Sequence, residues 1–194
     1  MKWKACMIIL LLMNAEMWGQ QNRVKLGFIG FPSQSGFGIG NIGYERLDRS
    51  KKRSWQLLYS MSGGSAAVDL ETYKRKWITV ERIVYFNTRN KKLDYFYTLF
   101  LETGKRTSEP GYIAVYDTSR YDGLKAFELS PGVAGGLRFA LSKRLGLETG
   151  GGPKFIWLNG EEQYYNRRDD IHFSKDYRKT KLGFRFMFSF SWQF

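Results

Sequence analysis

Residues 181–194 read KLGFRFMFSFSWQF and alternate strictly between two kinds of side chain. The odd positions are mostly polar or small. Strict alternation gives a β-strand one apolar and one polar face, whereas a helix would spread the same aromatics around its circumference. We therefore predict a two-faced β-strand over these residues. Its apolar face carries Leu182, Phe184, Phe186, Phe188, Phe190, Trp192 and Phe194.

The same period of two recurs along the chain and predicts an all-β protein. Residues 55–61 and 93–101 are clear examples, each with an apolar or aromatic residue at every odd position. The segment 78–86 is ambiguous, because Glu81 and Arg82 place a charge on each face. In all we predict eight strands, over residues 23–31, 38–47, 54–63, 76–87, 92–103, 129–141, 145–158 and 180–194.

The predicted connections differ in length on the two sides of this sheet. The second, fourth and sixth connections are short, at residues 48–53, 88–91 and 142–144. The fifth and seventh, Gly104–Glu128 and Asn159–Lys179, each exceed twenty residues. Short turns at one end and long loops at the other are typical of a barrel in the bacterial outer membrane.

The first twenty residues have the pattern of a secretory signal. Lys2 and Lys4 precede an apolar run over residues 6–13, which is too short to span a bilayer, since a membrane helix needs about 20 residues. We expect cleavage near Gly19. Cys6 is the only cysteine, so the mature chain would have no disulfide and no thiolate metal site. Its net charge, after loss of Lys2, Lys4 and Glu16, would be +12.

The chain resembles the small eight-stranded outer-membrane barrels, of the OmpX and OmpA-transmembrane kind. The resemblance rests on the signal, the eight predicted strands, the pattern of loop lengths and the terminal Trp192-Gln193-Phe194. The resemblance implies a signal peptide at residues 1–20. It further implies a closed, antiparallel, up-and-down transmembrane β-barrel over residues 21–194, in the bacterial outer membrane. Its surroundings would be lipid and lipopolysaccharide, and the barrel-assembly machinery would recognise the C-terminal strand.

In such a barrel one face of each strand contacts lipid and the other faces the lumen. We expect Phe184, Phe186, Phe188, Phe190, Trp192 and Phe194 to face the membrane. The opposite faces carry mixed charges that would pair inside a lumen filled by side chains. These are Lys25, Glu45, Asp94, Glu102, Arg138, Glu148, Lys154 and Arg185. Interfacial aromatics are expected near the periplasm at Tyr44, Trp55, Tyr95, Trp192 and Phe194, and at the outer rim at Trp77 and Trp157.

Two motifs could indicate a reaction or a cofactor. Residues 38–43 match G-x-G-x-x-G, but no helix follows to hold a pyrophosphate, so glycines that allow curvature and close packing explain them better. His172, the only histidine, follows Asp169 and Asp170 and precedes Ser174, among many cations. A solvated loop explains it better than a base or a metal ligand. We therefore predict no catalytic, cofactor-binding or metal-binding residue.

The excess of positive charge has a simple interpretation in a membrane. Nucleic acid is not an expected partner of a secreted chain. Cations in the long connections would face phosphate groups of lipopolysaccharide, at about 1 kcal/mol per residue near the charged surface. These cations are Lys105, Arg106, Arg167, Arg168, Lys175, Arg178, Lys179 and Lys181.

The sequence thus predicts a non-enzymatic barrel that is structural or makes surface contacts. Tyrosines of the long loops, such as Tyr112, Tyr116, Tyr121, Tyr164 and Tyr165, are where a protein or glycan partner would bind. Two alternatives remain open. One is a soluble periplasmic barrel of the lipocalin kind, with its aromatics inward around an apolar ligand. The other is an outer-membrane enzyme that modifies lipid A through His172.

Overall fold

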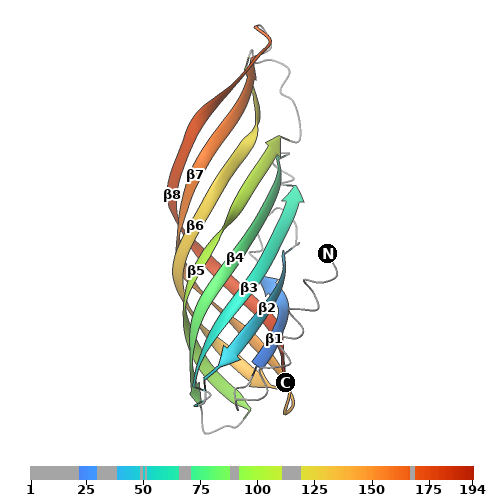
Figure 1. Ribbon diagram of the computed structural model, residues 1–194, viewed down its shortest axis with the longest axis vertical. Coiled ribbons are helices and arrows are strands. Elements are labelled where there is room, and N and C mark those ends of the chain that lie inside the picture. The colour runs from blue at the N-terminus through green and yellow to red at the C-terminus, as the bar shows by residue number, and fades with distance from the viewer. Residues whose placement is uncertain are drawn as a thin grey trace, which may run out of the picture.

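The computed structural model describes residues 22–29, 39–48, 50, 52–65, 71–87, 92–110, 119–166 and 169–194. All eight predicted strands are present (Figure 1). The predicted signal peptide, residues 1–20, lies outside the described residues. The strands are β1 (Asn22–Ile29), β2 (Ile39–Leu47), β3 (Arg53–Ser65), β4 (Glu71–Asn87), β5 (Leu93–Pro110), β6 (Ser119–Ala140), β7 (Leu145–Asn166) and β8 (Ile171–Gln193).

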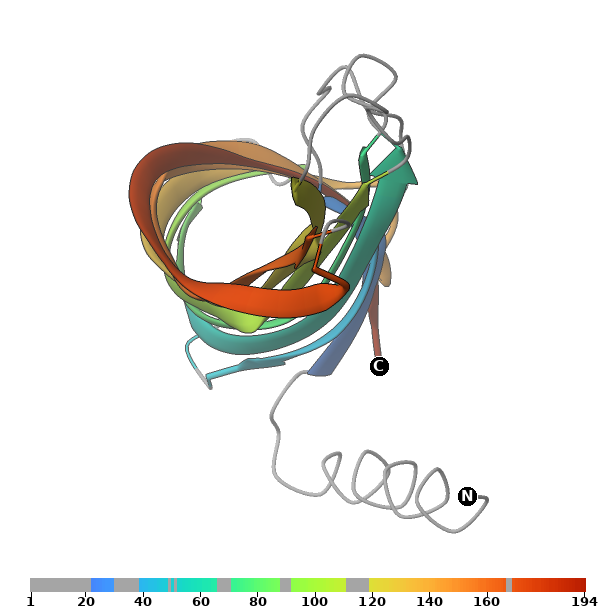
Figure 2. The ribbon, with the colours of Figure 1, turned by 90° about the horizontal axis from the view of Figure 1, so that it is seen from above.

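Each strand pairs antiparallel with the next, and β8 pairs antiparallel with β1, so the sheet closes into a ring (Figure 2). The closing register runs from Arg23 opposite Gln193 to Ile29 opposite Met187. The predicted closed, eight-stranded, up-and-down barrel is confirmed. The described part of the chain holds no helix with the length and hydropathy of a membrane span.

Alternation along the strands divides the barrel into an apolar outside and a polar inside. On β8, Phe184, Phe186, Phe188, Phe190 and Trp192 lie on the outer face, each at least 40% exposed. Arg185, Met187, Ser189 and Ser191 lie between them and are buried in the lumen. Phe194 follows the end of the strand and is partly buried.

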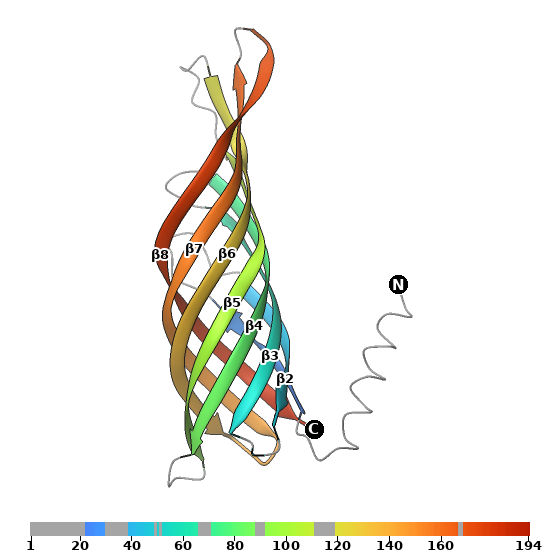
Figure 3. The ribbon, with the colours of Figure 1, turned by 60° about the vertical axis from the view of Figure 1, so that its left-hand side comes forward.

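The strands lengthen steadily around the ring, from 8 residues in β1 to 23 in β8. The β7–β8 hairpin therefore rises well beyond the first strands (Figure 3). The prediction of two connections longer than twenty residues is therefore wrong. Most of Gly104–Glu128 belongs to β5 and β6, and most of Asn159–Lys179 belongs to β7 and β8, leaving only residues 111–118 and 167–170 as connections.

The physical reason for this error is that hydropathy and backbone pairing are separate properties. Above the apolar band both faces of a strand can be polar, so the alternation in hydropathy that marks a strand disappears. The backbone ladder does not need it and continues up to Asn166 opposite Ile171. Exposed apolar side chains form a band on the outer face, from Ile78 to Phe86 on β4 and from Leu182 to Trp192 on β8. We call the parts of β4–β8 beyond this band the extension; it covers the residues before Ile78 on β4 and residues 171–181 on β8.

The faces of β4 resolve the ambiguity left by its sequence. Glu81 points into the lumen and is fully buried, while Arg82 lies outside with its guanidinium 5.0 Å from the centre of the Trp55 ring. Trp77 shares the inner face with Glu81 and is only 2% exposed. Its predicted place at the outer rim is therefore wrong, whereas Trp157 is 62% exposed on the outer face.

One residue of the glycine-rich segment shows why that segment lacks side chains. Gly43 on β2 is the register partner of Leu58 on β3. A Cβ atom at Gly43 would lie 2.0 Å from Leu58 Cδ2, far inside van der Waals contact. The segment continues as strand, which supports a packing role for this glycine and not the start of a dinucleotide fold.

Deleting Trp192–Phe194 should prevent formation of a stable barrel. It removes the residues paired with Arg23, Val24 and Leu145, and the unpaired backbone groups would lie at the seam of the ring. The measurement is heat-modifiable migration on gels after refolding in detergent. Replacing Trp192 by Phe keeps the backbone and should migrate as the parent chain does. A truncated chain that folds at the parent's yield would contradict the prediction.

The charged interior as a candidate functional site

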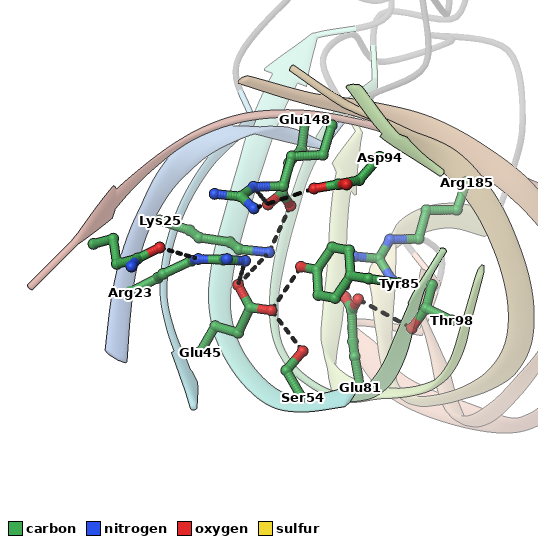
Figure 4. A network of polar contacts seen from close by, with 12 residues as sticks. Arg23, Lys25, Glu45, Ser54, Glu81, Tyr85, Asp94, Thr98, Glu148 and Arg185 are labelled. Carbon is green, nitrogen blue, oxygen red and sulfur yellow. Dashed lines mark hydrogen bonds and ion pairs between the residues drawn. The ribbon is translucent and has the colours of Figure 1, made fainter. Parts of the chain in front are cut away.

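Among the described residues, twelve charged side chains of the inner face form two ion-pair networks, with six cations and six carboxylates in all. The lower network surrounds Glu45 and includes Glu148 (Figure 4). It consists of Arg23, Lys25, Glu45, Asp94, Arg138 and Glu148. The upper network surrounds Glu102 and consists of Arg75, Glu81, Glu102, Glu128, Lys154 and Arg185.

Glu45 is the centre of the lower network because four side chains from three strands converge on it. Arg23 Nη1 donates to Glu45 Oε2 over 3.3 Å, and Lys25 Nζ lies 3.1 Å from the same oxygen. Ser54 Oγ and the Tyr85 hydroxyl donate to Oε1 over 2.5 and 2.6 Å. The carboxylate is fully buried, so these donors replace the water that it has lost.

Lys25 links this centre to the other side of the barrel seam. Its ammonium donates to Glu148 Oε2 over 2.5 Å, from β1 to β7. The intervening strand β8 presents Ser189 and Ser191 to the lumen, and these small side chains leave room for the contact. Arg138 continues the network, with Nε 3.5 Å from Glu148 Oε1 and Nη1 3.6 Å from Asp94 Oδ2.

Glu102 holds the upper network together. Lys154 Nζ donates to its Oε2 over 2.6 Å, and Arg75 Nη2 donates to the same atom over 3.0 Å. Arg185 Nε lies 3.5 Å from Oε1. Arg185 is fully buried as a side chain and donates from Nη2 to Glu81, to which Thr98 also donates.

Glu128 closes the upper end of this network. Arg75 Nη2 donates to Glu128 Oε1 over 2.5 Å, and Ser130 Oγ donates to the same atom over 2.9 Å. The guanidinium of Arg75 also stacks on Trp77, 4.0 Å from the ring centre. A buried apolar cluster packs beside both networks and consists of Leu58, Trp77, Ile83, Tyr85, Phe96 and Met187.

All eight lumen residues predicted from sequence lie on the inner face and belong to these networks. Sequence reasoning missed four further members: Arg23, Arg75, Glu81 and Glu128. Arg75 and Glu128 fall outside the predicted strands, so no face was assigned to them. Counting by twos from inward-facing Arg138 back along β6 would have reached Glu128, had the predicted strand continued.

The outer face has the opposite character. Large apolar side chains that are more than a third exposed occur on every strand, from Leu26 on β1 to Trp192 on β8. On β4 this band runs from Ile78 to Phe86, and on β8 from Leu182 to Trp192. A soluble lipocalin-like barrel would place apolar residues around its ligand and polar residues outside. The observed distribution is the reverse.

His172 lies on β8 near the tip of the extension, not in a loop. Its Nδ1 is 3.4 Å from Asp122 Oδ2, its ring packs on Tyr165 at 4.7 Å between centres, and its side chain is 75% exposed. Asp122 sits at a register irregularity of β6. An open cavity of about 500 Å³ lies here, lined by Asp122, Glu161, Gln163, Tyr164, His172, Phe173 and Ser174. Within the described ranges, no three His, Cys, Asp or Glu side chains are arranged to hold a metal ion.

No family model and no curated protein matches this chain. Among solved structures it is similar to Neisserial surface protein A, with a TM-score of 0.53, 11% identity, and coverage of 90% of this chain and 96% of that one. It also aligns with Ail, the attachment invasion locus protein of Yersinia pestis, with a TM-score of 0.47, 12% identity, and coverage of 92% and 100%. The E. coli outer membrane protein W aligns with a TM-score of 0.40 and 12% identity, over 91% of this chain and 98% of that one. The first likeness confirms the predicted resemblance at the level of the fold.

Replacing Glu81 by Gln should destabilise the barrel by about 3–5 kcal/mol, because it leaves the buried guanidinium of Arg185 without its nearest counter-charge. The measurement is the free energy of unfolding in urea, in detergent micelles. As the control, Glu161→Gln removes an exposed carboxylate on β7 and should change the free energy of unfolding little.

The double variant Glu81→Gln, Arg185→Met tests whether charge is the cause. It removes both charges and should recover a large part of the loss, because neither partner is then left as an uncompensated buried charge. If the double variant is less stable than Glu81→Gln alone, the loss does not come from an uncompensated charge.

Proposed function

We propose that this chain is a bacterial outer-membrane β-barrel protein, made with a signal peptide at residues 1–20 that is removed on secretion. The single observation that carries this proposal is the apolar band around the closed ring. A contiguous apolar surface of this extent marks a membrane or protein contact, and a closed barrel is one of only two backbone architectures that span a bilayer.

The height of the band supports the same proposal. Leu182 to Trp192 is a stretch of eleven residues, and a tilted membrane strand needs about 9–11. Phe184, Phe186, Phe188, Phe190 and Trp192 would then face lipid, with Phe194 at the periplasmic interface. The C-terminal strand that carries them is the segment on which the barrel-assembly machinery would act.

Cations on the outer face just beyond the band fit a layer of anionic head groups. Lys76 on β4 and Lys105 on β5 are exposed register partners, and Lys125 and Arg178 lie farther around the ring. Like charges directly opposite each other on a sheet repel, and phosphate groups of lipopolysaccharide would relieve that repulsion. This placement supports lipopolysaccharide as the surrounding ligand.

The role within the membrane that the geometry supports best is structural, with surface contacts through the extension. The lumen is occupied by paired charges and apolar side chains, most of them buried. Beyond the band, β5–β8 form a raised wall in place of long flexible loops. Tyr164 stacks on Phe173 and Tyr165 packs on His172, so these aromatics stiffen the tip on which a protein or glycan partner would bind.

A lipid A-modifying enzyme is the second candidate, because His172, Asp122 and Ser174 line one cavity. Against it stand the exposure of His172 and its position far along the extension from the apolar band, where acyl chains would lie. We therefore propose a non-enzymatic barrel.

Placing Arg at position 186 should cost the barrel about 2–4 kcal/mol, because the side chain would enter the middle of the bilayer. The measurement is unfolding in lipid vesicles. A spin label at position 186 should be accessible to oxygen dissolved in lipid, and one at position 187, on the inner face, should not. Equal accessibility at the two positions would contradict lipid exposure of Phe186.

His172→Ala should leave lipid A unchanged in cells that produce the protein, if the chain is not an enzyme. The measurement is mass spectrometry of extracted lipid A, with an empty-vector strain and Ser174→Ala as controls. A change in acylation that the parent produces and His172→Ala abolishes would overturn the non-enzymatic assignment.

A further inference from the structure

Three cations lie on the inner wall of the extension, above the upper network. They are Arg106 on β5 and Lys179 and Lys181 on β8. The sequence predicts them in or beside long connections that face lipopolysaccharide. Strand parity places them inside: Arg106 is the register partner of inward-facing Arg75, and Lys181 and Lys179 lie four and six residues before buried Arg185 on the same face.

These three cations are not matched by carboxylates. The two networks already balance, with six charges of each sign. Glu102 and Glu128 are held by Arg75 and Lys154. In the part of the chain that the structure describes, none of Arg106, Lys179 and Lys181 forms an ion pair. Farther up the wall, Lys175 lies opposite Glu162, so a carboxylate faces that cation.

The three cations act on one another. The charge on Lys181 is repelled by Arg106, Lys179 and Lys154, against attraction from Glu128. Arg106 and Arg75 are direct partners across β4 and β5, and like charges in that position are destabilising. An anion bound between them would remove this repulsion.

Buried apolar side chains lie beside the cations on neighbouring strands. Ile156 and Leu158 on β7 are the register partners of Lys181 and Lys179, and Ala126 on β6 is the partner of Arg106. With Leu124 they form a buried apolar cluster against which Tyr177 packs. Charges beside such a cluster interact more strongly than they do in open water.

Two buried donors at the same level have no acceptor among the described residues. They are Trp77 Nε1 and Arg75 Nε. Trp77 is 2% exposed, and the Arg75 guanidinium stacks on its ring. Buried N–H groups nearly always have a partner in folded proteins. These two are available to donate to a bound anion, as are other unpartnered lumen groups such as Arg185 Nη1.

We propose that the inner wall of the extension carries a binding site for a phosphate group, formed by Arg106, Lys179 and Lys181. Arg75 lies at the lower edge of this site. A phosphate carries more than one negative charge and several acceptor oxygens, which suits one guanidinium and two ammonium groups. The group is the phosphate of a lipid head group or of a soluble phosphorylated molecule. The site goes beyond the structural role proposed above.

The test is a titration of the full barrel, refolded in uncharged maltoside micelles, with inorganic pyrophosphate. Calorimetry gives the affinity, and amide chemical shifts of residues 106, 179 and 181 locate the site. The triple variant Arg106→Ala, Lys179→Ala, Lys181→Ala should bind at least about tenfold more weakly, because it loses three charge-assisted contacts. Heat-modifiable migration verifies that each variant is folded.

The matched control removes three cations from the outer face of the same strands: Lys105→Ala, Lys125→Ala, Arg178→Ala. It changes net charge equally and should weaken binding less than about threefold, through long-range charge alone. Equal losses in the two triple variants would show general attraction or an adventitious ion only and would overturn the site. Absence of binding to the parent barrel at millimolar pyrophosphate would overturn it as well.

A second titration distinguishes the two sources of the phosphate. Micelles are doped with phosphatidic acid or, as the control, with phosphatidylcholine. If phosphatidic acid shifts the same amides and pyrophosphate competes with it, the ligand is a lipid head group. If only pyrophosphate shifts them, the ligand is a soluble phosphorylated molecule.

Discussion

The pairing of β1 with β8 is the constraint on which the rest of this structure depends. Only seven residue pairs, from Arg23–Gln193 to Ile29–Met187, turn an eight-stranded meander into a ring. Closure removes the two sheet edges along this part of the wall and gives every backbone group there a partner. It also gives each strand an inside and an outside, so the alternation in the sequence becomes a difference between lumen and surroundings.

Once the ring is closed, its interior must be satisfied by the chain itself. The ring is narrow enough for side chains from different strands to meet, and β8 supplies serines where Lys25 must reach Glu148. Each network balances three cations with three carboxylates, which avoids a buried charge without a partner. Apolar residues such as Ile83 and Met187 fill the remaining space. The lumen is therefore a polar core, and the apolar surface that a soluble protein would bury lies on the outside.

The sequence alone allowed the fold to be predicted, because its decisive signals are local. Alternation in residues 181–194 needs no knowledge of the partner strand, and the short turns can be recognised from their polar residues. The lumen residues followed, since the face opposite an aromatic face is the inner one. Strand length could not be predicted. Its signal in the sequence is hydropathy, and beyond the apolar band Gly104 and Gly160 resemble loop residues although both are paired in the ladder.

The same limit explains why the sequence does not place every charge. A residue in a predicted loop has no face, so the sequence groups Lys179 and Lys181 with the cations directed at lipopolysaccharide. In a continuous strand their position is fixed by parity with Arg185, whose side chain must lie in the lumen to reach Glu81. One buried ion pair thus determines the side on which residues six positions away lie. Arg106 follows the same rule from Glu102, so the cations without an ion pair, on β5 and β8, all lie on the inner surface of the extension.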